Sequence, residues 1–140
     1  NKPLSFDDTS SVTDMVSMFA DTPVFNQPLN FDTSSVTDMS LMLLSASAFD
    51  QPLNFSTSSV IHMDHMFLYA NSLSNTNKLL IRCAWAGTLA FASAGYGSNW
   101  ASGSCASRRL PSSSLPPPPL RRRGRQRGRR KLHGKLLSRR

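Results

Sequence analysis

The sequence predicts an α/β repeat protein: a short solenoid with one strand and one short helix per 24-residue unit, a helical C-terminal cap and a disordered basic tail. Three features of the 140-residue chain lead to this prediction. The same text restarts every 24 residues up to about residue 73, the match then stops, and the composition changes abruptly at Ser107. We therefore divide the chain into a repeat array at residues 1–73, a cap at 74–106 and a tail at 107–140.

The repeat is visible in three segments, which read FDDTSSVTDM, FDTSSVTDM and FSTSSVIHM and begin units at residues 6–30, 31–54 and 55 onward. Apolar residues recur at one spacing, as in the columns Val12, Val36, Val60 and Met15, Met39, Met63. One unit cannot bury its apolar side alone, so stacked units are expected to share a continuous core. Residues 1–6 match the end of a preceding unit, so we expect the chain to be part of a longer array.

Within a unit, residues 25–31 predict a strand, because Phe25, Leu29 and Phe31 lie on one face at a period of two. Pro28 and Pro52 each remove a backbone donor. We therefore expect irregular strand pairing there, with Asn and Gln side chains supplementing the backbone hydrogen bonds.

A helix is expected to begin near Ser35, which together with Asp38 resembles a capping box. In the first unit, the apolar residues that follow have helical spacing: Val12, Met15, Val16 and Phe19. A strand and a short helix every 24 residues falls in the range of about 20–29 residues that is typical of leucine-rich repeats. The predicted fold is therefore a short leucine-rich-repeat-like solenoid.

The units FDTSSVTDM and FNQPLNFDTSSVTDMSLM resemble the BspA-like leucine-rich-repeat surface proteins. This repeat family was first catalogued as a domain of unknown function in mycoplasma surface lipoproteins and is abundant in marine protists. The resemblance covers about residues 1–75, and the segment that follows, through Trp100 and Cys105, resembles the closing segment of the protist members. It implies a cell-surface or secreted protein used in adhesion or recognition and supplies no catalytic residues. The chain departs from the family's pattern at His62 and His65, where a typical unit has small polar residues.

The segment after Leu73 predicts two short helices, at 77–86 and 88–94, that cover the last open edge of the array. Packing accounts for its aromatic residues Trp85, Tyr96 and Trp100 better than a ligand site does. Cys83 and Cys105 flank this segment, and a disulfide between them would fit an oxidising compartment. Two free, buried thiols are the alternative.

The formal net charge of +8 combines two unlike regions. Residues 107–140 contain thirteen basic residues and no acid, whereas residues 1–106 contain three basic residues and all eight acids, every one of them Asp. The tail is expected to be disordered. Its Arg-rich part could bind RNA or DNA phosphates, or anionic lipid or polysaccharide. A PxxP-type ligand at 116–121, a solvated linker and a wrong reading frame are the alternatives. The candidate residues for binding a polyanion are Arg121, Arg122, Arg123, Arg125, Arg127, Arg129, Arg130 and Lys131.

No motif of an enzyme or a cofactor site occurs in the sequence, so we expect neither catalysis nor a cofactor. His62, Asp64 and His65 could share one side of a helix, but they lack the further ligands that a metal site needs, and none is predicted. Turn formation and capping account for the Asp residues without calcium. No apolar run reaches the roughly 18–20 residues of a membrane span.

These observations predict a non-catalytic recognition or adhesion module, extracellular or at the cell surface, that binds an unidentified protein or glycan through its repeat face. The candidate ligand-facing residues are Asn26, Asn30, Asp50 and Asn54, although hydrogen bonding between units is the favoured explanation for them. Binding of a nucleic acid or another anionic polymer through the tail is the alternative function.

Overall fold

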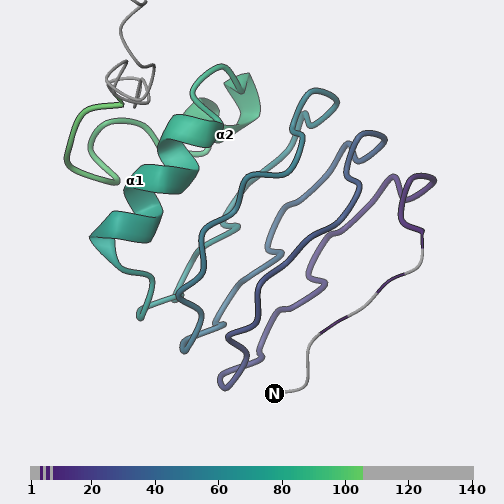
Figure 1. Cartoon of the computed structure of the whole chain (residues 1–140), viewed down its shortest axis with the longest axis horizontal. Helices are drawn as coiled ribbons and strands as arrows, with labels where there is room; N and C mark the ends of the chain where they lie inside the picture. The colour runs from purple at the N-terminus through teal and green to yellow at the C-terminus, as the bar shows by residue number, and fades with distance from the viewer. Residues whose placement is uncertain (1–3, 5, 7, 106–140) are drawn as a thin grey trace, which may run out of the picture. The chain divides into compact units, whose positions relative to one another are not determined.

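The computed structural model of the chain describes residues 4, 6 and 8–105. It contains two helices, α1 at Asn75–Ala84 and α2 at Leu89–Ser93, and both follow the repeating part of the sequence. No described residue lies in a β-strand, and parallel pairing is limited to isolated bridges from Asp38 to Asp14 and to His62. The prediction of a leucine-rich-repeat-like solenoid with a strand and a short helix in each unit is therefore wrong (Figure 1). The tail, whose disorder was predicted, lies outside the described residues.

The backbone at the predicted helix positions bonds to the neighbouring unit instead of to itself. In the second unit the N–H groups of alternate residues, 39, 41, 43 and 45, donate to carbonyl oxygens of the third unit at 2.8–2.9 Å. The first unit donates to the second in the same way, for example from the Met15 N–H to the Asp38 carbonyl at 2.9 Å. An α-helix needs each of these N–H groups for the carbonyl four residues earlier. The resulting backbone ladder therefore excludes the helix, and the segments run side by side (Figure 1).

The spacing of the apolar residues resembles that of a helix because tight turns lie between the hydrogen bonds of this ladder. The N–H groups of Met42, Leu44 and Ala46 each donate to the carbonyl three residues earlier. Two positions in every unit adopt positive φ, between 54° and 62°: Ser17, Asp21, Leu41, Ser45, His65 and Tyr69. The chain thus returns to the core every three or four residues, so Met39, Met42, Leu43 and Ala46 are all buried without forming a helix.

The predicted strand positions do supply alternating core residues, although they form no ladder. Leu29, Phe31, Leu53 and Phe55 are buried, and the rings of Phe31 and Phe55 lie 6.3 Å apart. Pro28 and Pro52 cannot donate a backbone hydrogen bond, which removes the pairing that defines a strand. One side of each unit is therefore joined to its neighbour by backbone bonds and the other mainly by side chains.

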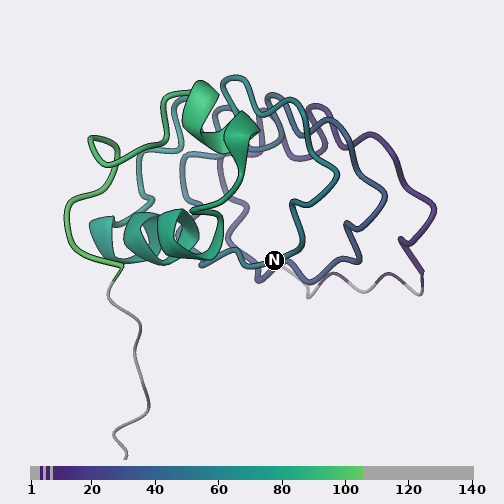
Figure 2. The ribbon, with the colours of Figure 1, turned by 90° about the horizontal axis from the view of Figure 1, so that it is seen from above.

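Residues 74–105, the closing segment, complete the last unit with side-chain groups. Its first helix, α1, begins after Ser74, whose hydroxyl accepts from the Asn77 N–H. The Trp85 indole N–H donates to the Phe55 carbonyl at 3.0 Å. The Tyr96 hydroxyl accepts from the Phe67 N–H at 3.1 Å, whereas the equivalent Leu43 N–H donates to a carbonyl of the next unit. A tyrosine hydroxyl thus replaces the acceptor that a further unit would provide, and both helices lie at this end (Figure 2).

Neither helix of the described part is long and apolar enough to cross a membrane.

Removing the Tyr96 hydroxyl tests whether this group ends the backbone ladder. In Tyr96→Phe the buried Phe67 N–H loses its acceptor, which should lower the free energy of unfolding by about 1–3 kcal/mol in urea titrations. Hydrogen exchange at Phe67 should accelerate as well. Tyr69→Phe is the matched control, because Tyr69 is 62% exposed and should tolerate the change within about 0.5 kcal/mol. Equal stability of the two variants would contradict the role of Tyr96.

Candidate recognition surface and the cleft of the closing segment

Asn26 and Asp50, two of the candidate ligand-facing residues, join neighbouring units. The Asn26 Oδ1 accepts from the Asp50 N–H at 2.9 Å and from the Gln51 side-chain amide at 3.0 Å. One unit further on, the Asp50 Oδ1 accepts from the N–H and the hydroxyl of Ser74 at 2.9 and 2.8 Å, and from the Asn77 amide at 2.7 Å. These side chains therefore provide the bonds between units on the side where proline prevents a backbone ladder.

The same contacts favour the ionised form of Asp50. Its pKa lies below the ordinary value, first because of the Ser74 N–H, then because of the Asn77 amide and the Ser74 hydroxyl. A carboxylate that accepts several hydrogen bonds holds its charge more strongly. Asp50, near the end of the second unit, is thus a charged acceptor whose hydrogen bonds hold the start of α1.

Asn30 and Asn54, the other two candidates, are exposed and occupy the same position in consecutive units. They follow Asn26 and Asp50 by four residues in their units. Contact of Asn30 or Asn54 with a ligand stays a prediction. The candidate residues of the tail, Arg121 to Lys131, lie outside the described part.

The opposite side, which we call the laddered face, consists of the outward side chains of residues 13–21, 37–45 and 61–69. Its inward neighbours repeat, since Met15, Met39 and Met63 are all buried. Its outward positions differ from unit to unit, in the sets Thr13, Thr37, Ile61; Asp14, Asp38, His62; Ser17, Leu41, His65; and Asp21, Ser45, Tyr69. Ile61 and Tyr69, both in the third unit, are 66% and 62% exposed. On the laddered face the third unit therefore differs from the first two at each of these positions.

A cavity of about 450 Å³ opens where the third unit's part of this face meets the closing segment. Asp64, His65 and Tyr69 line it from one side, and Ser93 and Trp100 line it from the other. In the second unit the equivalent N–H groups, at Leu41 and Ser45, donate to the third unit. Within the described residues, the N–H groups of His65 and Tyr69 have no such acceptor. The cavity therefore combines aromatic, charged and backbone-donor groups.

His62, Asp64 and His65 belong to this face but do not make a metal centre. The described residues contain no group of three or more His, Cys, Asp or Glu side chains that could hold a metal ion. Slight burial raises the pKa of Asp38, but hydrogen bonds from Ser40, and to a smaller extent the electrostatic influence of His62, bring it below the ordinary value. Asp38 is thus a charged side chain beside His62 on the laddered face.

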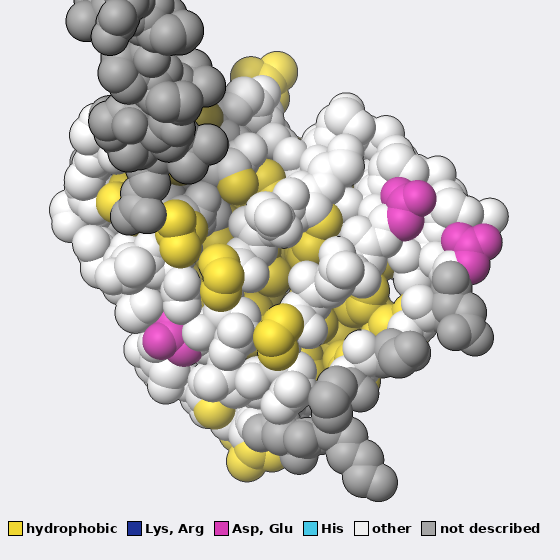
Figure 3. Space-filling view, in the orientation of Figure 1, with side chains coloured by type: hydrophobic (Ala, Val, Ile, Leu, Met, Phe, Trp, Pro, Cys, Tyr) yellow, Lys and Arg dark blue, Asp and Glu magenta, His cyan; other side chains and the backbone are white. Residues whose placement is uncertain are grey.

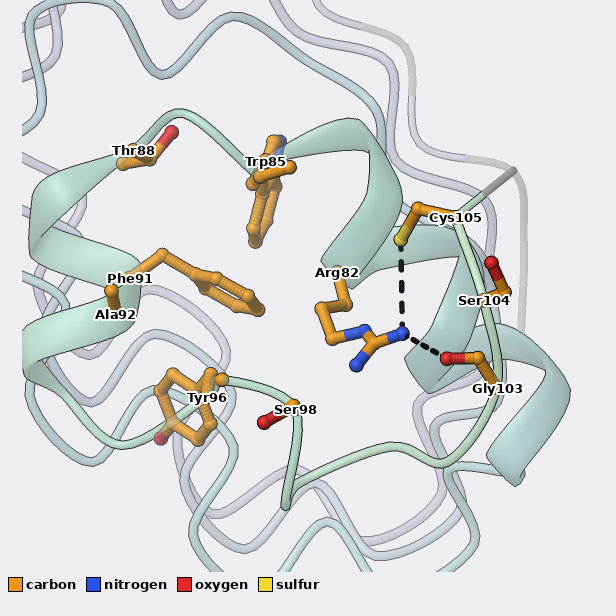
Figure 4. Close-up of a pocket in the computed structure, with 12 residues that line it drawn as sticks. Arg82, Trp85, Thr88, Phe91, Ala92, Tyr96, Ser98, Gly103, Ser104 and Cys105 are labelled. Atoms are coloured by element: carbon orange, nitrogen blue, oxygen red, sulfur yellow. Dashed lines mark hydrogen bonds between the residues drawn. The ribbon is translucent and has the colours of Figure 1, made fainter. Parts of the chain in front are cut away.

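A second cleft, of about 470 Å³, lies within the closing segment (Figure 4). Trp85, Phe91 and Tyr96 form an aromatic wall, and Arg82 lies across from Phe91 and Tyr96. The Arg82 Nη2 donates to the Gly103 carbonyl at 2.6 Å, while its Nε is buried without a hydrogen-bond partner. No described acid forms a salt bridge with Arg82. No sequence pattern indicated this cleft, since Arg82 was recognised only as one of three basic residues before the tail.

A disulfide between Cys83 and Cys105 closes one end of the cleft, with the two Cα atoms 5.2 Å apart. It joins α1 to the loop that carries Gly103. Gly103 has a φ of 123°, and a Cβ added there would come within 2.7 Å of the Leu79 side chain. Glycine and the disulfide together therefore hold the loop at the distance from which the Gly103 carbonyl reaches Arg82.

The aromatic residues of the closing segment have packing roles. Trp85 and Tyr96 are only 2% and 8% exposed, and each bonds to a backbone group of the third unit. Trp100 is half-buried against Phe67, and the Lys78 ammonium lies 5.8 Å from its ring. The same residues also line the two cavities, Trp85 and Tyr96 with only a small exposed part.

The bonds of Asp50 predict a specific pH dependence. A carboxyl group with a lowered folded-state pKa stabilises the protein above its unfolded value, near 4, and this stability is lost as the pH falls through the folded-state pKa. Asp50→Asn keeps a side-chain oxygen, as in Asn26, but does not titrate. Urea unfolding between about pH 5 and pH 2 should therefore show a smaller loss of stability for this variant than for the wild type. Equal losses would mean that Asp50 does not contribute.

Removal of the disulfide should destabilise the closing segment. The bond spans 22 residues, and Cys83→Ser with Cys105→Ser should lower the free energy of unfolding by about 2–4 kcal/mol. Urea titration measures the change, and mass spectrometry without reduction verifies the bond in the wild type. The reduced wild type is the control and should match the double variant. A stability equal to that of the oxidised protein would contradict the prediction.

Comparison with known proteins places the chain in a family. No curated protein and no solved structure matches it significantly. A family model described as "Mycoplasma protein of unknown function, DUF285" matches residues 1–86, which is more than half of the 140 residues. The chain therefore belongs to this family of mycoplasma-type proteins.

Proposed function

We propose that the chain is a non-catalytic recognition or adhesion module of a cell-surface or secreted protein, related to the BspA-like surface proteins, and that it binds a protein or glycan through its laddered face. The proposal depends on one observation. Buried columns such as Met15, Met39 and Met63 stay apolar in every unit, whereas the third unit's outward positions on the laddered face differ from those of the first two in charge, size and polarity.

The contrast between the two sides of the molecule supports this choice of face. On the other side the first two units are alike, since Pro28 is equivalent to Pro52 and Asn30 to Asn54, and in the third unit α1 takes the place of this segment. Asn26 and Asp50 on that side are already engaged in bonds between units. If the protein recognises its ligand through residues that differ between units, the ligand would therefore contact the laddered face. There the third unit offers Ile61 and Tyr69 as exposed apolar groups beside Asp64 and His65.

The chemistry of the third unit suits a protein or glycan partner. Aromatic rings with a polar group are common in interfaces, because they bury area and still satisfy hydrogen bonds. The cavity of about 450 Å³ beside Tyr69 and Trp100 adds donors and acceptors within reach of the rings. The disulfide supports location in an oxidising compartment, as for secreted and surface proteins.

The charge of the tail favours a second candidate function, which is binding of a nucleic acid or another anionic polymer. Thirteen basic residues without an acid would give an affinity that falls steeply with salt. The described part is acidic, and Figure 3 shows Asp side chains but no Lys or Arg of the described residues on the face in view. A polyanion would therefore be bound by the tail alone.

A substitution that makes the third unit resemble the others tests the first proposal. Ile61→Thr, Tyr69→Ser and His65→Ser introduce residues found at equivalent positions, namely Thr37, Ser45 and Ser17. The labelled full chain is applied to immobilised neutral and acidic polysaccharides and to intact cells, and binding is measured at several salt concentrations. The triple variant should lose at least about tenfold in affinity for its surface partner, because interface hot spots concentrate the binding energy.

Two control variants separate the candidate functions. Asn30→Ser with Asn54→Ser changes the opposite side and should bind within about twofold of the wild type. Replacement of Arg121, Arg122 and Arg123 by Gln should weaken binding to heparin and RNA only. Loss of all binding in this tail variant, with full binding in the triple variant, would reject the laddered face and favour the tail.

A further inference from the structure

We propose that the cleft of the closing segment binds a small carboxylate on a flat apolar body, an arylalkyl carboxylate, with Arg82 as the anion-binding residue. This site is separate from the laddered face and does not depend on the proposed function. Its volume of about 470 Å³ lies within the range of about 300–1,000 Å³ that is typical of small-molecule sites.

The walls of the cleft determine the body of the ligand. Trp85, Phe91 and Tyr96 form the floor of the cleft; they pack on one another, with the Trp85 and Phe91 centroids 5.4 Å apart, and are 2%, 3% and 8% exposed. A ligand would therefore rest on the edges of an aromatic cluster that is already packed. Ala86, Ala92 and Gly97 add small apolar surface, and the hydroxyl residues Thr88, Ser98 and Ser104 line the cleft as well. A planar apolar group therefore fits the interior better than a flexible polar one.

Arg82 determines the charge of the ligand. A guanidinium has five N–H donors. Among the described residues the Arg82 Nη2 donates to the Gly103 carbonyl and to the Cys105 Sγ at 3.8 Å, whereas Nε is buried and has no hydrogen-bond partner. Its remaining donors face a cleft whose other side chains are aromatic, small or hydroxylic (Figure 4). A neutral apolar ligand would displace water from these donors and leave them without acceptors, which costs binding free energy. A carboxylate pairs with a guanidinium through charge-assisted hydrogen bonds and avoids that loss.

The position of Arg82 in α1 suggests a competing explanation. Arg82 lies in the last turn of the helix, where any cation interacts favourably with the carbonyl end. A lysine would serve that purpose equally well, but it cannot present the planar fork of donors that a carboxylate matches. Arg82→Lys therefore separates the two roles.

The disulfide makes the site depend on the redox state. Cys105 and Gly103 lie on the same wall, and the bond to Cys83 fixes this wall against α1. Reduction would release the wall that holds the Arg82 guanidinium through the Gly103 carbonyl. Ligand affinity should therefore fall when the disulfide is reduced. The comparison is made without denaturant, so that the protein stays folded.

The test uses indole-3-acetate and its neutral analogue indole-3-acetamide, with the oxidised full chain and ligand-observed NMR titrations. The acid should bind saturably and at least about tenfold more tightly than the amide, because hydrogen bonds to a charged group are the stronger ones. Arg82→Lys should reduce the preference for the acid to about threefold or less. Reduction of the disulfide should weaken binding of the acid by at least about fivefold.

Lys78→Gln is the matched control. Lys78 lies one turn before Arg82 on α1, carries the same charge and does not line the cleft. Its substitution should leave the preference for the acid within twofold of the wild type, and thermal unfolding verifies that both variants are folded. Equal binding of acid and amide, an equal effect of Lys78→Gln and Arg82→Lys, or no saturable binding by the oxidised chain would each overturn the proposal.

Discussion

The backbone hydrogen bonds between neighbouring units are the constraint on which the rest of the structure depends. Alternate N–H groups, such as those of Met39 and Leu43, leave their own segment and bind carbonyls 23 residues further on. The bonds that remain within a unit close tight turns, and they require positive φ at residues such as Leu41 and Ser45. Such conformations cost free energy at residues other than glycine, so they persist because the ladder and the buried side chains hold them. A unit separated from its neighbours would lose both.

A ladder of this kind needs a terminator, since the last unit presents donors that no further unit accepts. The closing segment meets this need only in part. Tyr96 accepts from Phe67 and Trp85 donates to Phe55, but among the described residues the N–H groups of His65 and Tyr69 have no such backbone acceptor, and both residues line a cavity. Where the closing segment lies along the third unit, it covers the core. Where it lies further from the third unit, polar groups stay accessible to solvent. The candidate recognition site of the third unit is thus a consequence of incomplete termination.

Of the apolar stripe predicted in the first unit, Met15 and Phe19 are buried, but Val16 is 39% exposed, and the secondary structure that carries the stripe is not the predicted helix. The spacing of Met39, Met42 and Leu43 fits a helix and equally fits a chain of tight turns, and periodicity alone cannot separate the two. Pro28 and Pro52 had already indicated that pairing between units would be irregular on their side. The cleft at Arg82 could not be foreseen, because its walls come from α1, α2 and the loop at Gly103, which no sequence pattern brings together.

Tyr96 connects the end of the ladder to both candidate binding sites, because it lines the cavity of the laddered face and the cleft at Arg82. Its hydroxyl is committed to the Phe67 N–H, and burial raises its pKa, so it stays neutral as an acceptor. Its ring lies between Phe67 at 5.3 Å and Phe91 at 5.3 Å. A shift of this ring would disturb the terminal hydrogen bond and both cavities together. The residue that ends the ladder therefore also fixes the shape of the two surfaces available for binding, which ties recognition at this end of the molecule to the stability of the third unit.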